Sequence, residues 1–166
     1  CYFDGNSGSG NDGCEWNPQC DPKYPGSVDG SGKTACAYDE KKASNPNVCP
    51  PGQPQSQKCQ DFCAPLTPNG CDCFGCCDLY DPAGNLLKTV SLNSGCSLAN
   101  INDPVKCATC TKSTTCVNDC QKCELCIGKP TLPADCYNGL PDTGVPAIGL
   151  PGQVCSGGQQ SCNDQT

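Results

Sequence analysis

The chain has 166 residues, of which 21 are cysteine, and a formal net charge of −7, with neither Arg nor His in the sequence. A serine or cysteine nucleophile without His lacks its usual general base, so we expect no enzyme. An acidic chain without a guanidinium binds phosphate backbones poorly, so we expect no nucleic-acid partner.

The cysteines are expected to supply stability that a hydrophobic core would otherwise provide. Val, Ile, Leu and Phe together number 23 of the 166 residues, too few to offset the conformational entropy of folding by burial alone. Disulfides can supply the difference, typically ~2–4 kcal/mol each, and they persist in oxidising compartments. We therefore expect a small disulfide-rich, loop-dominated fold, located outside the cell or on its outer surface.

Cysteine density divides the chain into three parts. Residues 1–58 form a Gly/Pro/Asn-rich N-terminal arm, residues 59–136 a cysteine-dense core, and residues 137–166 a Gly/Pro/Gln-rich C-terminal arm. Neither arm has enough apolar residues for a core of its own, so we expect one structural unit.

Cys1 is the first residue of a sequence that contains no Met, so we expect that a leader was removed. Because the number of cysteines is odd, at least one sulfur has no partner within the chain. A Cys followed by a Gly/Ser/Asn-rich tether is typical of the start of a bacterial lipoprotein. Lipidation of Cys1 would leave twenty cysteines for ten bridges, and it would be the one route by which the protein binds a membrane. An interchain disulfide and an ordinary thiol at Cys1 are the alternatives.

The segment 4–15, DGNSGSGNDGCE, is a candidate calcium loop. Asp4, Asn6, Asp12 and Glu15 match the first, third, ninth and twelfth positions of an EF-hand loop. The obligatory glycine is misplaced and no amphipathic helices flank the loop. We therefore favour a flexible polar linker, keep a weak Ca²⁺ site as the alternative, and expect no other cofactor.

The run CDCFGCCDLY at residues 71–80 places four cysteines within seven positions. Its thiolates could hold zinc together with Cys107 and Cys110, and the spacing of Cys120, Cys123 and Cys126 resembles the start of a ferredoxin site. A Cys-x-x-Cys redox motif would need an α/β core, which the sequence lacks. We favour disulfides, with each sulfur of residues 71–77 bonded to a different neighbour.

Three elements are predicted in the core. Alternating apolar residues around a Pro82–Gly84 turn indicate a β-hairpin at about 76–92. A helical turn is expected at about 103–108, because Asp103-Pro104 suits a helix start. A second is expected at about 119–127, between a capping Asn118 or Asp119 and a stop at Gly128.

The candidate disulfide cysteines comprise all those after Cys1. They are Cys14, Cys20, Cys36, Cys49, Cys59, Cys63, Cys71, Cys73, Cys76, Cys77, Cys96, Cys107, Cys110, Cys116, Cys120, Cys123, Cys126, Cys136, Cys155 and Cys162. Their connectivity cannot be deduced from the sequence.

The central segment, about 59–136, contains CDCFGCCDLYDPAGN, then DPVKCATC and CQKCELCIGKP. It resembles cysteine-rich exported proteins of myxobacteria and related bacteria. The resemblance implies export to a bacterial surface, and it implies no active site.

These features predict a non-enzymatic structural or adhesive surface protein that associates with itself, as the subunit of a disulfide-stabilised extracellular filament would. The alternatives are a soluble disulfide-rich binding module, such as an inhibitor, toxin or ligand-capturing protein, and, third, a thiolate metal-binding protein. The aromatic residues are scattered and the single Trp16 lies in the N-terminal arm, which counts against a binding module with one anchoring loop.

Overall fold

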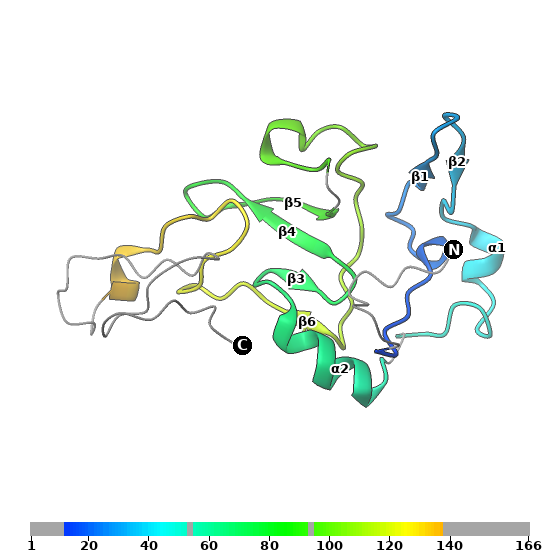
Figure 1. Ribbon diagram of the computed structural model, residues 1–166, viewed down its shortest axis with the longest axis horizontal. Coiled ribbons are helices and arrows are strands. Elements are labelled where there is room, and N and C mark those ends of the chain that lie inside the picture. The colour runs from blue at the N-terminus through cyan, green and yellow to red at the C-terminus, as the bar shows by residue number, and fades with distance from the viewer. Residues whose placement is uncertain (1–11, 53–54, 93–94, 138–166) are drawn as a thin grey trace, which may run out of the picture.

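The computed structural model describes residues 12–52, 55–92 and 95–137. Within these ranges the chain forms a two-stranded sheet and a four-stranded sheet, both antiparallel, joined by long loops (Figure 1). The expected fold class, small, disulfide-rich and loop-dominated, is confirmed. None of the helices in these ranges is both long enough and apolar enough to cross a bilayer.

The N-terminal part contains short elements that the sequence analysis did not predict. They are the 3₁₀ turn η1 (Pro18–Cys20), strands β1 (Ser27–Val28) and β2 (Thr34–Ala35), and the helix α1 (Glu40–Ala43). The Asp39 side chain starts α1 by accepting hydrogen bonds from the backbone N–H groups of Lys41 and Lys42.

The predicted hairpin at 76–92 is confirmed. Strand β4 (Cys76–Tyr80) pairs with strand β5 (Leu86–Ser91), and the turn between them uses Gly84 at φ +87°. Leu79 and Val90 are fully buried on one face of the hairpin. The alternation of apolar residues therefore locates the inner face at Val90, whereas Leu86 at the start of β5 is 56% exposed.

Two short strands extend the hairpin to the order β5-β4-β3-β6, namely β3 (Cys71–Asp72) and β6 (Val117–Asn118). The helix α2 (Gln57–Cys63) and the 3₁₀ turn η2 (Ala64–Leu66) precede β3, and η2 packs beside β6 (Figure 1). α2 begins at Ser56, whose hydroxyl accepts a hydrogen bond from the N–H of Cys59 at 3.1 Å.

The segment that follows β5 contains η3 (Leu98–Asn100) and the expected helical turn at 103–108. Asp103 accepts hydrogen bonds from the N–H groups of Val105 and Lys106, and its carbonyl accepts one from the N–H of Cys107 at 2.8 Å. The turn at this position is confirmed.

The helical turn expected at 119–127 is wrong in detail, because this segment is a disulfide-closed loop. Cys120 bonds to Cys126, with Cα atoms 6.2 Å apart. Six residues of α-helix would separate these Cα atoms by about 9 Å, beyond the span of a disulfide. The 3₁₀ turn η4 (Ala134–Tyr137) follows and is tied back by the Cys123–Cys136 bond.

The core consists largely of sulfur. One buried cluster contains five cysteines and Phe74, and a second contains Leu79, Val90 and Cys107. Large apolar side chains are instead common at the surface, where Phe62, Leu66, Leu86 and Val105 are each more than half exposed.

Candidate functional site

Eight disulfides join sixteen of the candidate cysteines between described residues. The pairs are Cys14–Cys59, Cys20–Cys49, Cys71–Cys77, Cys73–Cys116, Cys76–Cys110, Cys96–Cys107, Cys120–Cys126 and Cys123–Cys136. Cys36 is disulfide-bonded as well. So many disulfides indicate an oxidising environment. Cys1, Cys155 and Cys162 lie outside the described residues.

Cys63 is fully buried on α2, and it is not a member of the eight disulfides between described residues. A disulfide at Cys63 therefore stays a prediction. Its neighbours on α2 and on the N-terminal arm already form the Cys14–Cys59 bond.

The cysteines of residues 71–77 do not all bond to different partners. Cys71 and Cys77 face each other across β3 and β4 and bond to one another, so the expectation of four separate neighbours is wrong. Cys73 and Cys76 reach out of the run, to Cys116 and Cys110. The run therefore closes its own two strands and is anchored twice to the loop that leads to β6.

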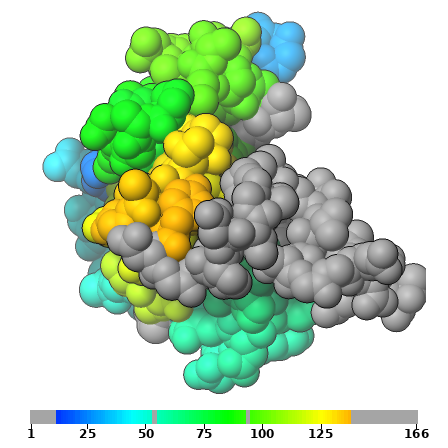
Figure 2. Space-filling view, turned by 90° about the vertical axis from the view of Figure 1, so that its left-hand side faces the viewer, coloured from blue at the N-terminus to red at the C-terminus, as the bar shows by residue number. Residues whose placement is uncertain are grey.

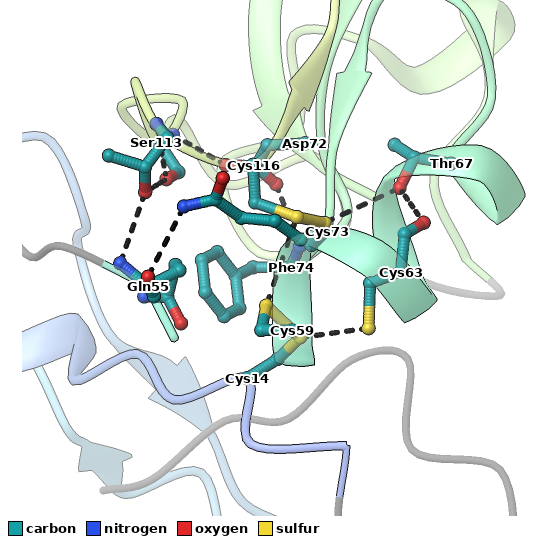
Figure 3. The surroundings of a disulfide bond; sticks show 12 residues. Cys14, Gln55, Cys59, Cys63, Thr67, Asp72, Cys73, Phe74, Ser113 and Cys116 are labelled. Carbon is teal, nitrogen blue, oxygen red and sulfur yellow. Dashed lines mark hydrogen bonds between the residues drawn. A yellow bond between two sulfur atoms is a disulfide. The ribbon is translucent and has the colours of Figure 1, made fainter. Parts of the chain in front are cut away.

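Five sulfurs meet where the N-terminal arm, α2 and the sheet come together, and we call the residues that carry them, Cys14, Cys59, Cys63, Cys73 and Cys116, the sulfur cluster (Figure 3). Two of them lie four residues apart on α2 and therefore project from the same side of the helix. All five side chains are at most 2% exposed.

The sulfurs of the cluster lie close together across chain segments. The Sγ atoms of Cys14 and Cys63 are 2.8 Å apart, and those of Cys59 and Cys116 are 3.8 Å apart. The sulfurs of Cys14, Cys59, Cys63 and Cys73 all lie within 4.8 Å of one another. Four thiolates so placed could surround a tetrahedral metal ion if the two disulfides were reduced, so a thiolate metal site stays a prediction.

Aromatic rings cover the cluster on the side of the N-terminal arm. Trp16 stacks on Phe74 with ring centroids 6.3 Å apart and meets the edge of Tyr24 at 5.5 Å. Within the arm, Gln55 donates to the carbonyl of Glu15 at 2.9 Å and accepts from its N–H at 3.2 Å. The backbone N–H of Gln55 also donates to the Thr115 hydroxyl of the core at 3.3 Å. The arm is thereby held against the core by sulfur, ring and amide contacts together.

Asp72 organises the backbone beside the cluster. Its carboxylate accepts hydrogen bonds from the N–H groups of Phe74 at 2.9 Å and Ser113 at 2.7 Å (Figure 3). It also accepts one from the N–H of Cys76 at 2.8 Å. Burial raises the pKa of the Asp72 carboxyl, while these three donors and the charge of Lys112 act in the opposite direction. With three donors satisfied internally, the carboxylate has a structural role.

The residues of the expected calcium loop separate in the structure. Asp4 and Asn6 lie outside the described residues. Asp12 is buried and accepts the N–H of Cys14 at 3.0 Å, whereas Glu15 is exposed. The second oxygen of Asp12 is buried without a hydrogen-bond partner in the described part of the chain. A Ca²⁺ site here stays a prediction.

A cavity of about 410 Å³ lies beside Trp16 and is lined by three prolines and by residues 111–114. Its volume falls in the range of small-molecule sites. Its charged groups already have partners: Asp21 accepts two hydrogen bonds from Thr111, and Lys112 pairs with Asp78 at 2.6 Å. The cavity therefore offers a ring and hydroxyl groups rather than an unpaired charge.

Comparison of the chain with protein-family models, with curated proteins and with solved structures finds no match in any of the three. The resemblance of residues 59–136 to cysteine-rich exported proteins of myxobacteria therefore stays a prediction.

Proposed function

We propose that the protein is a non-enzymatic structural or adhesive component of an extracellular surface, and that it associates head to tail with copies of itself. The observation that carries this proposal is which side chains are buried and which are exposed. Cysteines fill the buried core, while ten large apolar side chains lie at the surface of the described residues. Exposed apolar groups that gather on a folded protein are typical of contact surfaces.

Two pairs of these side chains supply a head and a tail. Phe62 and Leu66, which are 51% and 62% exposed, lie on α2 and η2 beside β6, one edge of the four-stranded sheet. Leu86 and Leu87, which are 56% and 51% exposed, begin β5, the other edge, and as consecutive strand residues they expose apolar side chains on both faces of that edge. In Figure 2 the hairpin end (green) and α2 (blue-green) lie on opposite sides of the yellow-to-orange segment.

Two different apolar surfaces on opposite edges favour a heterologous contact, in which the head of one copy packs on the tail of the next. Such contacts continue into a filament unless the rotation between copies closes a ring. Self-complementary contact through one surface would instead stop at a dimer.

The test uses the oxidised full-length chain and two double variants, Phe62→Ser with Leu66→Ser, and Leu86→Ser with Leu87→Ser. Light scattering during size-exclusion chromatography should show species larger than a monomer that grow with concentration for the wild-type chain. Each double variant alone should be monomeric. Their mixture should form dimers and nothing larger, because each variant keeps one intact surface. A wild-type chain that stays monomeric at every concentration would refute the proposal.

A soluble binding module is the second candidate, and the cavity beside Trp16 is the observation that favours it. A small neutral ligand bound there would change the emission of the single tryptophan. Quenching by acrylamide gives a direct reading: protection of Trp16 by added ligand in a monomeric protein would favour the binding module. Protection that appears only on self-association would favour the structural role.

A further inference from the structure

The cavity beside Trp16 has two chemically different walls, which come from different parts of the chain. The N-terminal arm contributes four rings, those of Trp16, Pro22, Pro50 and Pro51. The core contributes residues 111–114, TKST, three of which carry a hydroxyl group. A ligand in the cavity would therefore contact apolar rings of the arm and hydroxyl groups of the core.

The two charged residues that line the cavity within the described ranges already have partners. Asp21 is 5% exposed, and its carboxylate accepts hydrogen bonds from the N–H of Lys23 at 2.9 Å and the N–H of Thr111 at 2.7 Å. The Lys112 ammonium pairs with the Asp78 carboxylate at 2.6 Å. A charged ligand would have to compete with these partners, which favours a neutral one.

A further hydrogen bond between Thr111 and Asp21 prepares an acceptor for a ligand. The Thr111 hydroxyl donates to the carboxylate at 2.9 Å, so its hydrogen is committed and its oxygen can only accept further hydrogen bonds. The neighbouring carboxylate strengthens such an accepted bond, because hydrogen bonds in a chain polarise one another. Thr111 and Thr114 are both exposed, so a ligand in the cavity can reach their side chains.

We propose that this cavity is a binding site for a neutral saccharide. A pyranose ring has a face of C–H groups, which packs on aromatic and proline rings, and an edge of hydroxyl groups, which pairs with hydroxyl and carboxylate oxygens. The two walls match these two features, and a volume of about 410 Å³ suits a mono- or disaccharide. Such a site rests on the second candidate function, a binding module, and shares no residue with the two surfaces assigned to head-to-tail contact.

The first experiment measures sugar binding to the oxidised full-length chain by saturation-transfer NMR and by the emission of Trp16, the single tryptophan. The probes are the methyl glycosides of glucose, galactose, mannose and N-acetylglucosamine. We expect at least one glycoside to bind with a Kd on the order of 1 mM, as is usual for ligands of this size. Glucosamine, glucuronic acid and hexaproline test a cation, an anion and a proline-rich peptide. Binding of one of these three without any glycoside, or no binding at all, would overturn the proposal.

The second experiment locates the bound sugar with two pairs of variants. Ala43→Phe places a ring at the cavity from the end of α1, and its matched control, Lys41→Phe, adds the same ring at an exposed position of α1 outside the cavity. Thr114→Val removes one hydroxyl with little change of shape, and Thr34→Val does the same on β2.

We expect Ala43→Phe to abolish sugar binding and Thr114→Val to raise the Kd about 3- to 10-fold, as the loss of one hydrogen bond would. Both controls should leave the Kd unchanged. An unchanged Kd in a folded Ala43→Phe chain would overturn the proposal. If circular dichroism shows that this chain does not fold, an unchanged Kd in Thr114→Val would do so.

The double variant Phe62→Ser with Leu66→Ser separates sugar binding from self-association. It alters one of the head-to-tail surfaces and no residue that lines the cavity. We therefore expect it to bind the same glycoside with the Kd of the wild-type chain, whatever its oligomeric state. Loss of sugar binding in this variant would place the sugar at the association surface and overturn the proposal.

Discussion

Replacing Asp72 with Asn isolates the contribution of one buried carboxylate. The two side chains have the same shape, but the amide has one acceptor oxygen where the carboxylate has two. Asp72 uses one oxygen for Phe74 and Cys76 and the other for Ser113. In the variant an NH₂ group must face at least one backbone N–H.

The magnitude follows from these contacts. One hydrogen bond to a charged group, worth about 1.5–3 kcal/mol, is lost, and a buried N–H group is left without an acceptor at a cost of about 1–3 kcal/mol. Removing a buried charge offsets part of this loss. We therefore expect Asp72→Asn to lower the free energy of unfolding by about 2–3 kcal/mol.

The assay is guanidinium unfolding with the disulfides intact, followed by the fluorescence of Trp16, whose ring stacks on Phe74. The matched control is Asp81→Asn in the hairpin turn, where one carboxylate oxygen accepts the N–H of Asn85 and the other its side-chain amide. This exposed turn should tolerate the change with a much smaller loss. Equal losses in the two variants would refute the reasoning that buried acceptor geometry dominates.

The pH dependence of the wild-type chain relative to Asp72→Asn has a definite sign. Burial raises the pKa of Asp72, so the folded state binds a proton more readily than the unfolded state between the ordinary and the raised pKa. The contribution of this carboxyl to stability is therefore largest below that window and decreases as the pH rises through it. Exposed carboxyls with lowered pKa values, such as Asp103, act in the opposite sense but are common to both chains. Unfolding both chains from about pH 3 to pH 7 checks the difference. A wild-type advantage that grows with pH would contradict it.

Two further predictions concern other buried contacts. The ammonium of Lys129 is buried and donates to two backbone carbonyls of the 120–126 loop, at 3.0 and 2.9 Å. Lys129→Met should destabilise this loop by about 2 kcal/mol, which corresponds to about 30-fold faster amide exchange of its N–H groups, whereas the exposed Lys122→Met should change it little. Equal effects would contradict a role for the buried charge. Gly128 and Gly32 both have positive φ, but an added Cβ at Gly128 would meet a backbone oxygen of β4 at 2.1 Å, whereas at Gly32 it would meet nothing within 4 Å. Gly32→Ala should cost about 1–2 kcal/mol for the backbone conformation alone, and Gly128→Ala should cost clearly more in the same unfolding assay. Similar losses of stability in the two variants would show that β4 can move away from the added Cβ at Gly128 without an energetic cost.

The hairpin could be predicted from the sequence because both of its signals are local. Alternation of side chains from Leu86 onward and the turn residues Pro82 and Gly84 specify the same structure. The helix α2 gave no such signal, since its core-facing positions are Cys59 and Cys63, while Phe62 faces solvent. Counting cysteine as an apolar residue after the Ser56 cap would have indicated this helix.

The sulfur cluster could not be predicted, because its members come from distant parts of the sequence. Short spacings grouped Cys107 and Cys110 with the run at 71–77 as possible zinc ligands. In the structure Cys110 is bonded to Cys76 and Cys107 to Cys96. The two disulfides of the cluster, Cys14–Cys59 and Cys73–Cys116, instead join residues that are 45 and 43 positions apart in the sequence. Such pairings depend on how the segments pack, which the spacing of cysteines does not encode.

The order of the disulfides along the chain also determines which single peptide-bond cleavages would separate the chain into two fragments. The eight bonds between described residues enclose three blocks, 14–59, 71–116 and 120–136, and a single cleavage inside any block leaves both fragments covalently attached. Among these bonds, none spans residues 60–70 or 117–119, and there the backbone is held in α2, η2 and β6. Proteolysis of folded proteins requires local unfolding, so within the network of these eight bonds the two short segments are where a cut depends on the backbone structure alone.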